Sequence, residues 1–448
     1  MARSPQNQAI PPDPELQSGV QFLRAGMIDR AEPIFRSALG RFGDRPDVLH
    51  YLAVCLSQRG EFTDAEALWR RAIARDPNEP ILSYNLGLVA HRLGRPDEAA
   101  RRFRDTIRRA PAHFEARLAL SSIYIELGRF AAALRDLSEI IANLQRAMQE
   151  PGGEALRPLL ARSRNMTGHA LYRLGQCEEA LGVLDEAMGD AGQDAVRRGQ
   201  ILGDRALALG GLGRFDEAIA TAQQALEQAP DSASLNHVLG FVLTNAGRGA
   251  EAVAPTLRAL ELDPNFIPAL KTLAVAQNLA GQGADAVTSL RRALHLAPLE
   301  RGTVLQLSLV HIERDEFTEA AETLEPYLKA KPDDVEALNN QGLALRGLGQ
   351  LEEAQRALKR ANRLSSENPL VLTNLGRVLV DLGRVAEARP LHEHALRILP
   401  GDARLLAHYG ACLMALGEND QARETLDAAL AADPGNAEAL AARVRLDA

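Results

Sequence analysis

Apolar and polar positions along the chain form one recurring pattern of two helices separated by a tight turn. In residues 94–111, GRPDEAARRFRDTIRRAP, a glycine and a turn precede an amphipathic segment that ends at a proline. Apolar residues spaced by three or four among charged ones predict a helix with one buried face. The same pattern recurs from near the N-terminus to the end of the sequence, which predicts a chain of tandem helix pairs.

An alanine early in each second helix marks the register of the repeat. Nine of the eleven steps between equivalent alanines are 34 residues long, while the step from Ala133 to Ala180 is 47 and the next is 38. A fixed period in this range is typical of a solenoid, in which each unit packs against its neighbours. The marker residues are Ala31, Ala65, Ala99, Ala133, Ala180, Ala218, Ala252, Ala286, Ala320, Ala354, Ala388 and Ala422.

Three further columns keep this register. A glycine such as Gly94 stands five residues before the alanine in every repeat except one, where Asp315 replaces it; glycine there can take the left-handed conformation that ends a helix. A Gly, Ala or Ser, such as Gly87, stands twelve residues before the alanine, which predicts a close crossing of the two helices. In eight repeats a proline such as Pro111 ends the second helix.

A 34-residue unit with these features resembles the tetratricopeptide repeat. The match is carried by residues 84–87 (YNLG), Gly94, Ala99, Phe103 and Pro111, and again by residues 374–376 (NLG) and their continuation. The resemblance implies an all-α fold, a right-handed α-solenoid (superhelix) of about twelve repeats covering residues 12–436. It identifies an architecture and leaves the biological role open.

The two irregular steps predict where the stack changes. We expect a disordered lead over 1–11, repeats one to four over 12–147, an elongated helical hairpin with repeat five over 148–198, repeats six to twelve over 199–436, and a capping helix over 437–448. The extra residues around 148–160 contain a Pro-Gly-Gly turn between two apolar stripes, so the hairpin should be one to two turns longer and project. Either a tolerated insertion or a docking element would account for it.

The composition narrows the class of protein. A net charge of −8 disfavours a general nucleic-acid binder. Only four of the 51 basic residues are lysine; a biased genome or a preference for forked contacts to carboxylates would account for this. Three cysteines at apolar repeat positions suit a reducing compartment. With no apolar segment long enough for a membrane span or a secretory signal, the expected location is the cytoplasm of a bacterial cell.

The sequence offers no pattern typical of an enzyme. His392 and His394 are two residues apart on a helix and therefore face different ways, and the glycines at 210–213 follow no strand. The paired acids lie at helix starts, where they favour the helix dipole. We therefore expect no catalytic, cofactor-binding or metal-binding residues, and no cofactor.

The resemblance implies binding instead, because the first helices of this family line a concave groove. Amides there can bond a peptide backbone, arginine can take carboxylates, and aromatic rings can cover apolar side chains. Tyr172, Arg173, His237, Phe241 and Asn245 are the expected centre of the site. The expected groove residues are His50, Tyr84, His91, Arg92, Asn165, His169, Tyr172, Arg173, His237, Phe241, Asn245, Lys271, Asn278, Asn339, Arg346 and Arg377.

The expected function is a non-enzymatic scaffold or adaptor that binds an extended peptide or a helix of a partner protein in this groove. The expected partner is a protein or peptide, with neither nucleic acid nor a membrane span involved, and with self-association as a further possibility. The alternative is a regulatory or substrate-recruiting arm of a separately encoded glycosyltransferase or sulfotransferase. The paired basic residues of a chaperone-tail clamp do not occur at the second and sixth positions of the first helices.

Overall fold

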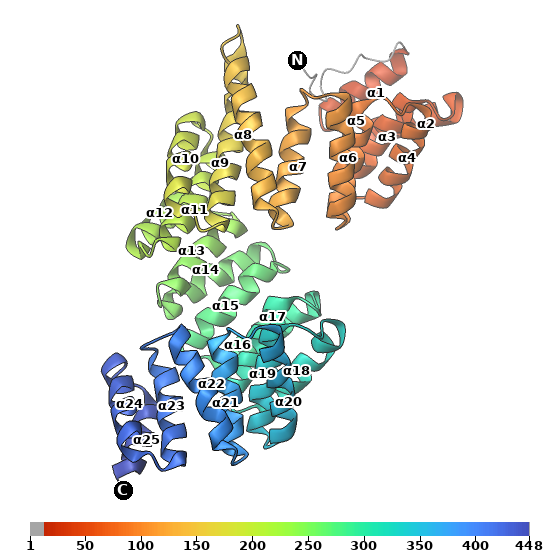
Figure 1. The fold of residues 1–448 in the computed structure, drawn as a ribbon. Coiled ribbons are helices and arrows are strands. Elements are labelled where there is room, and N and C mark those ends of the chain that lie inside the picture. The colour runs from red at the N-terminus through yellow and green to blue at the C-terminus, as the bar shows by residue number, and fades with distance from the viewer. Residues whose placement is uncertain (1–12, 448) are drawn as a thin grey trace. The chain divides into compact units, whose positions relative to one another are not determined.

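The computed structural model describes residues 13–447, and these residues form helices and turns with no strand. The prediction of an all-α chain of tandem helix pairs is confirmed. The chain divides into two compact units, Met1–Pro230 and Asp231–Ala448, here called the first and second unit. Each contains six helix pairs, and the second unit ends with one further helix (Figure 1). The expected disordered lead lies outside the described residues.

In both units, odd-numbered helices are the first and even-numbered helices the second members of their pairs. The first unit consists of α1 (Pro14–Arg24), α2 (Ile28–Phe42), α3 (Pro46–Gln58), α4 (Phe62–Arg75), α5 (Pro80–Arg92), α6 (Pro96–Arg109), α7 (Phe114–Glu126), α8 (Phe130–Ala147), the short 3-10 helix η2 (Gly153–Leu156), α9 (Arg157–Arg173), α10 (Cys177–Asp190), α11 (Ala195–Gly211) and α12 (Phe215–Gln228).

The second unit consists of α13 (Ala233–Asn245), α14 (Gly249–Leu262), α15 (Ile267–Leu279), α16 (Gly283–Leu296), α17 (Arg301–Glu313), α18 (Phe317–Ala330), α19 (Val335–Gly347), α20 (Leu351–Leu364), α21 (Pro369–Asp381), α22 (Val385–Ile398), α23 (Ala403–Leu416), α24 (Asn419–Ala432) and α25 (Ala437–Asp447).

Local chemistry sets where the helices begin and end. The Asn368 side chain accepts the backbone N–H groups of Leu370 and Val371 at the start of α21, which satisfies donors that have no partner within the helix. The turn inside each pair has a positive φ at its glycine, such as 72° at Gly94. Asp315 occupies the same turn position with φ 57°, and among the described residues it is the only non-glycine with a positive φ.

The two helices of a pair cross at the column of small residues, as the sequence predicts. A Cβ atom placed on Gly87 would lie 2.7 Å from the Phe103 ring, and one on Gly342 would lie 2.4 Å from Leu358. The marker alanines, such as Ala99, are fully buried at these crossings. A larger side chain would therefore force the helices apart.

The hairpin of α8 and α9 is longer than its neighbours. α8 has 18 residues and α9 has 17, while α7 has 13 and α10 has 14. Figure 1 shows the end of α8 extending past the neighbouring helices of the first unit. The contact division falls at Pro230, after this hairpin, and the sequence-based boundaries between blocks of repeats stay a prediction.

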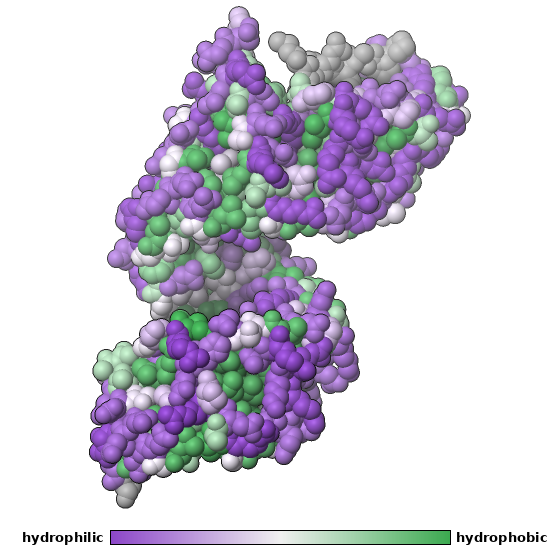
Figure 2. All heavy atoms as spheres, in the orientation of Figure 1, coloured by the Kyte–Doolittle hydropathy of each residue, from purple (hydrophilic) through white to green (hydrophobic). Residues whose placement is uncertain are grey.

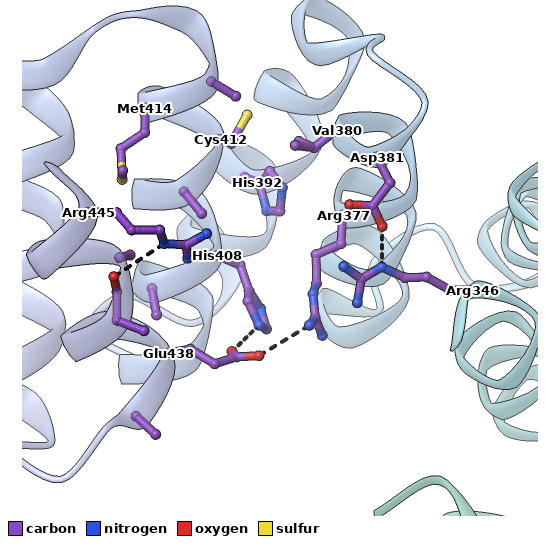
Figure 3. Close-up of a pocket in the computed structure, with 16 residues that line it drawn as sticks. Arg346, Arg377, Val380, Asp381, His392, His408, Cys412, Met414, Glu438 and Arg445 are labelled. Carbon is purple, nitrogen blue, oxygen red and sulfur yellow. Dashed lines mark hydrogen bonds and ion pairs between the residues drawn. The ribbon is translucent and has the colours of Figure 1, made fainter. Parts of the chain in front are cut away.

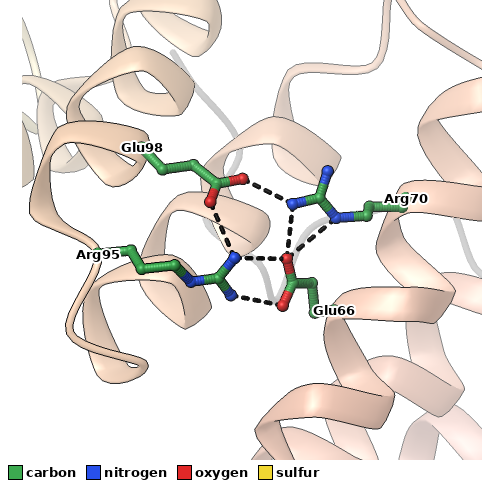
Figure 4. Close-up of polar contacts among 4 residues, drawn as sticks. All are labelled: Glu66, Arg70, Arg95 and Glu98. Atoms are coloured by element: carbon green, nitrogen blue, oxygen red, sulfur yellow. Dashed lines mark hydrogen bonds and ion pairs between the residues drawn. The ribbon is translucent and has the colours of Figure 1, made fainter.

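Charged side chains join successive second helices in the first unit. Glu66 on α4 binds Arg70 on the same helix and Arg95 at the start of α6, and Glu98 binds both arginines (Figure 4). The surface over α6 is strongly hydrophilic (Figure 2). This face is therefore stabilised by ion pairs between repeats.

Candidate functional site

Polar side chains on neighbouring first helices are joined by a series of contacts between residues 35 positions apart, here called rungs. His91 Nε2 lies 2.7 Å from Glu126 Oε2, and Asn278 Nδ2 donates to Glu313 Oε2 at 2.9 Å. With the marker alanine counted as position twenty of its repeat, each of these rungs runs from the twelfth position of one repeat to the thirteenth position of the next. Where successive repeats are 34 residues apart, a spacing of 35 joins positions offset by one.

Further rungs join other pairs of neighbouring first helices. His237 Nε2 lies 3.0 Å from the Thr272 hydroxyl, and Asn374 Nδ2 donates to Asn339 Oδ1 at 2.9 Å. The other two rungs join His169 to Asp204 and Arg346 to Asp381. Six of the expected groove residues are therefore already bonded to a neighbouring repeat, a role that the sequence reasoning missed.

His50 does not lie on an accessible surface. Only 6% of it is exposed, and its Nδ1 accepts the indole N–H of Trp69. Burial lowers the His50 pKa to about 4, so the ring is neutral at pH 7. The expectation that His50 contacts a partner is at odds with this burial, because its ring fills the space between α3 and α4.

The other expected residues differ in exposure. His91, Arg92, Arg173 and Asn245 are exposed, and the remaining eleven are half-buried. In the first unit the Tyr84 ring lies between Phe103 and His113, and the Arg173 guanidinium lies 5.0 Å from the centre of the Phe130 ring. Of the five residues expected at the centre of the site, Tyr172 and Arg173 belong to the first unit and the other three to the second.

A hollow of about 610 Å³ on α13, α15 and α17 brings together four of the expected residues. We call it the central hollow. Phe241, Ile267, Pro268 and Val275 give it apolar walls. The polar residues that line it are His237, Thr244, Asn245, Lys271, Thr272, Glu300 and Gln306.

Burial and short contacts fix the chemistry of the central hollow. The His237 ring centre lies 5.1 Å from that of Phe266 and 6.1 Å from that of Phe241. Burial lowers the His237 pKa to about 4, so its ring is uncharged at neutral pH. Lys271 Nζ donates to Glu300 Oε1 at 3.2 Å. The hollow therefore presents one aromatic ring, one neutral imidazole and one paired cation.

A second hollow, of about 660 Å³, lies at the C-terminal end of the second unit (Figure 3). We call it the terminal hollow. It includes two expected residues, Arg346 and Arg377, together with His392, His408 and Glu438, which were not among the expected groove residues. The sequence does carry a signal that sets His392 apart. It stands four residues after the marker alanine, where other repeats carry Phe, Trp, Leu, Ala or Thr.

Charged and titratable groups meet in the terminal hollow. Glu438 Oε1 accepts from Arg377 at 3.1 Å, and Glu438 Oε2 lies 2.5 Å from His408 Nε2. Contact with His408, and then the nearby arginines, lowers the Glu438 pKa to about 2. Burial first, and then repulsion by His408 and Arg377, lowers the His392 pKa to about 3.

Residues 13–447 hold no group of three or more His, Cys, Asp or Glu side chains placed to bind a metal ion. None of their helices is both long enough and apolar enough to cross a membrane.

Comparison with protein families supplies the decisive observation. The family model described as tetratricopeptide repeat matches residues 16–80, 56–100, 84–148 and 204–265. These matches follow the helix pairs described above. The chain is a tetratricopeptide repeat protein. In this repeat protein, residues 266–448 match a model described as cilia and flagella-associated protein 70 C-terminal domain.

Three solved structures are similar to this chain. A tetratricopeptide repeat protein from Parabacteroides merdae has a TM-score of 0.50 at 16% identity over 56% of this chain and 100% of its own. The Cut9–Hcn1 hetero-tetramer of APC/C gives 0.49 at 14% identity over 97% and 96%. Yeast Tom70 gives 0.46 at 15% over 96% and 94%. No curated protein matches the sequence, and the likenesses concern fold alone.

Proposed function

We propose that this tetratricopeptide repeat protein is a non-enzymatic scaffold that binds an extended segment of a partner protein in the central hollow. The observation that carries the proposal is the meeting of Phe241, Asn245 and Lys271 in one hollow that crosses three first helices. An aromatic wall beside amide and cationic groups suits a peptide, which has a polar backbone and alternating side chains.

Each of the three groups has a distinct role in this proposal. The Phe241 ring covers an apolar side chain of the segment, and the exposed Asn245 amide bonds its backbone. Lys271 is paired with Glu300. In place of this pair, Lys271 can bind an acidic group of the partner, or Glu300 can bind a basic one. The uncharged His237 ring also lines the hollow, and a partner can cover this ring without burying a charge.

The rung between His237 and Thr272 supports binding by holding α13 against α15. A site whose side chains are already fixed loses less conformational entropy when a partner binds. The cytoplasm is the proposed location, because all three cysteines are free thiols and are buried.

Selection of displayed random peptides against the full-length chain tests the proposal. We expect the selected peptides to lose at least tenfold in affinity, about 1.4 kcal/mol, when Phe241→Ala, Asn245→Ala and Lys271→Ala are combined. The matched control combines His91→Ala and Arg92→Ala on α5, in the first unit. Circular dichroism establishes that both variants fold. Equal affinity of the wild type and the central-hollow variant would reject this assignment of the site.

A further inference from the structure

We propose that the terminal hollow is a binding site for a carboxylate group, and that Glu438 occupies this site when no ligand is bound. The inference goes beyond the proposed function, because it assigns a second site with its own chemistry, away from the central hollow. The site lies wholly within the second unit and is formed by α19, α21, α22, α23 and α25.

The charge of the hollow is the first observation. Its lining has three arginines, Arg346, Arg377 and Arg445, against two acids, Asp381 and Glu438. Asp381 is engaged by Arg346, which leaves Glu438 as the partner of Arg377. A half-buried guanidinium without an anion loses hydration with nothing in return, so this position requires a carboxylate from some source.

The state of His392 is the second, independent observation. Only 1% of His392 is exposed, and neither of its ring nitrogens has a hydrogen-bond partner. In Figure 3 its ring lies between Cys412 and Arg377 at the wall of the hollow. Unpaired polar atoms in the interior are costly, and leucine fills the same column in the flanking repeats, at Leu358 and Leu426. A ligand in the hollow would supply the missing partner.

The placement of Glu438 makes exchange feasible. It lies in the first turn of α25, and about half of its side chain is exposed. Rotation about its side-chain bonds can move the carboxylate into water while the buried Ala439 and Ala442 hold the helix in place. A ligand can therefore enter without unfolding the end of the stack.

The geometry favours a carboxylate over other anions. One oxygen of Glu438 contacts Arg377 and the other contacts His408, and a ligand carboxylate has the same pair of oxygens for these two contacts. When Glu438 leaves the hollow, one negative charge leaves with it, and a ligand carboxylate restores that charge. A dianionic phosphate would add a charge beyond that balance.

Binding of glutarate to the full-length chain tests the proposal, followed through the imidazole NMR signals of His392 and His408. We expect glutarate to shift both signals, because its carboxylate replaces that of Glu438 beside the two imidazole rings. Glu438→Gln should tighten glutarate binding about tenfold, because the internal competitor is weakened. Arg377→Gln and, separately, His408→Asn should weaken it about tenfold or more.

Controls separate the outcomes. Glu424→Gln, an exposed acid on α24, should leave glutarate affinity unchanged, and Phe241→Ala should also leave it unchanged, which keeps this test independent of the central hollow. If an acidic peptide binds more tightly than glutarate, the carboxylate comes from a segment of a partner protein. If glutarate binds more tightly, the ligand is a small free carboxylate. Both outcomes support the site. Failure of glutarate to bind wild type and Glu438→Gln, or a preference for inorganic phosphate, overturns the proposal.

Discussion

The indole N–H of Trp69 donates a hydrogen bond to Nδ1 of His50 over 3.2 Å, inside the first unit. The two residues lie on α4 and α3, so the bond joins the two helices of one repeat. Both are almost fully buried. His50 can accept this bond only while that ring nitrogen is unprotonated, which makes the contact sensitive to acid.

The first prediction concerns pH. The His50 pKa is about 4 in the folded state and near 6.5 when unfolded, so the unfolded state binds more protons between these values. The His50 contribution is fully present above pH 6.5, and it falls by about 1.4 kcal/mol per pH unit below that value. Trp69 is the single tryptophan, so its fluorescence in urea titrations at pH 7.5 and 5 measures the effect.

The control for this prediction is His50→Gln, which keeps an acceptor for the indole and removes the titration. The variant should lose less stability than the wild type between the two pH values. Since His113 also has a pKa lowered by burial, part of the pH dependence will remain. Identical pH dependence in both proteins would show that His50 does not contribute.

The second prediction compares two glycines of one repeat. A Cβ atom on Gly168 would lie 2.5 Å from the buried Leu184, while one on Gly182 would meet nothing within 4 Å. Gly168→Ala should therefore destabilise the first unit by roughly 1–3 kcal/mol through overpacking. Gly182→Ala should stabilise it by roughly 0.5–1 kcal/mol, because alanine favours a helix interior. Thermal unfolding measures both, and shifts of the same sign would contradict the close crossing.

The third prediction concerns the turn at Asp315. Its φ of 57° lies in the left-handed region, which costs an L-residue roughly 1–2 kcal/mol. Asp315→Gly should therefore stabilise the second unit by roughly 1 kcal/mol, with aspartate tolerating this region better than most residues. The reverse change one repeat later, Gly349→Asp, should destabilise it. Urea midpoints of the two variants should move in opposite directions from the wild type.

The fourth prediction concerns the four-residue network in Figure 4. The Glu66 side chain is only 12% exposed and binds both Arg70 and Arg95, and these contacts lower its pKa. Glu66→Gln should cost about 1 kcal/mol, since networks contribute more than single exposed pairs. The control is Glu217→Gln, whose partner Arg214 is three residues away on the surface, and it should produce no measurable change. Urea unfolding by circular dichroism compares the two.

The periodic columns predicted the fold because each column has one physical cause. Glycine at the turn, a small residue at the crossing and proline after the second helix report backbone conformation and contact distance, which are local. Repetition across twelve units made the assignment unambiguous, even where Asp315 replaces glycine. The positive φ at Asp315 shows that the register of the turn does not depend on that residue alone.

The candidate site was less predictable, because the fate of a polar side chain depends on what faces it from the next repeat. His237 and Asn278 occupy positions that line a groove in this family, yet each is bonded to the neighbouring first helix. Such pairs are 35 residues apart and become visible only when two repeats are compared with an offset of one. Glu438 was expected only as part of a cap, and its contact with Arg377 spans 61 residues.

The rungs also constrain how the number of repeats can change. If residues 301–368 were deleted, the residue 35 positions after Asn278 would be Asp381, a carboxylate like the Glu313 that it now contacts. If only residues 301–334 were deleted, Gly347 would stand there and the amide would have no acceptor. Loss of repeats in this part of the chain should therefore be better tolerated two at a time than singly.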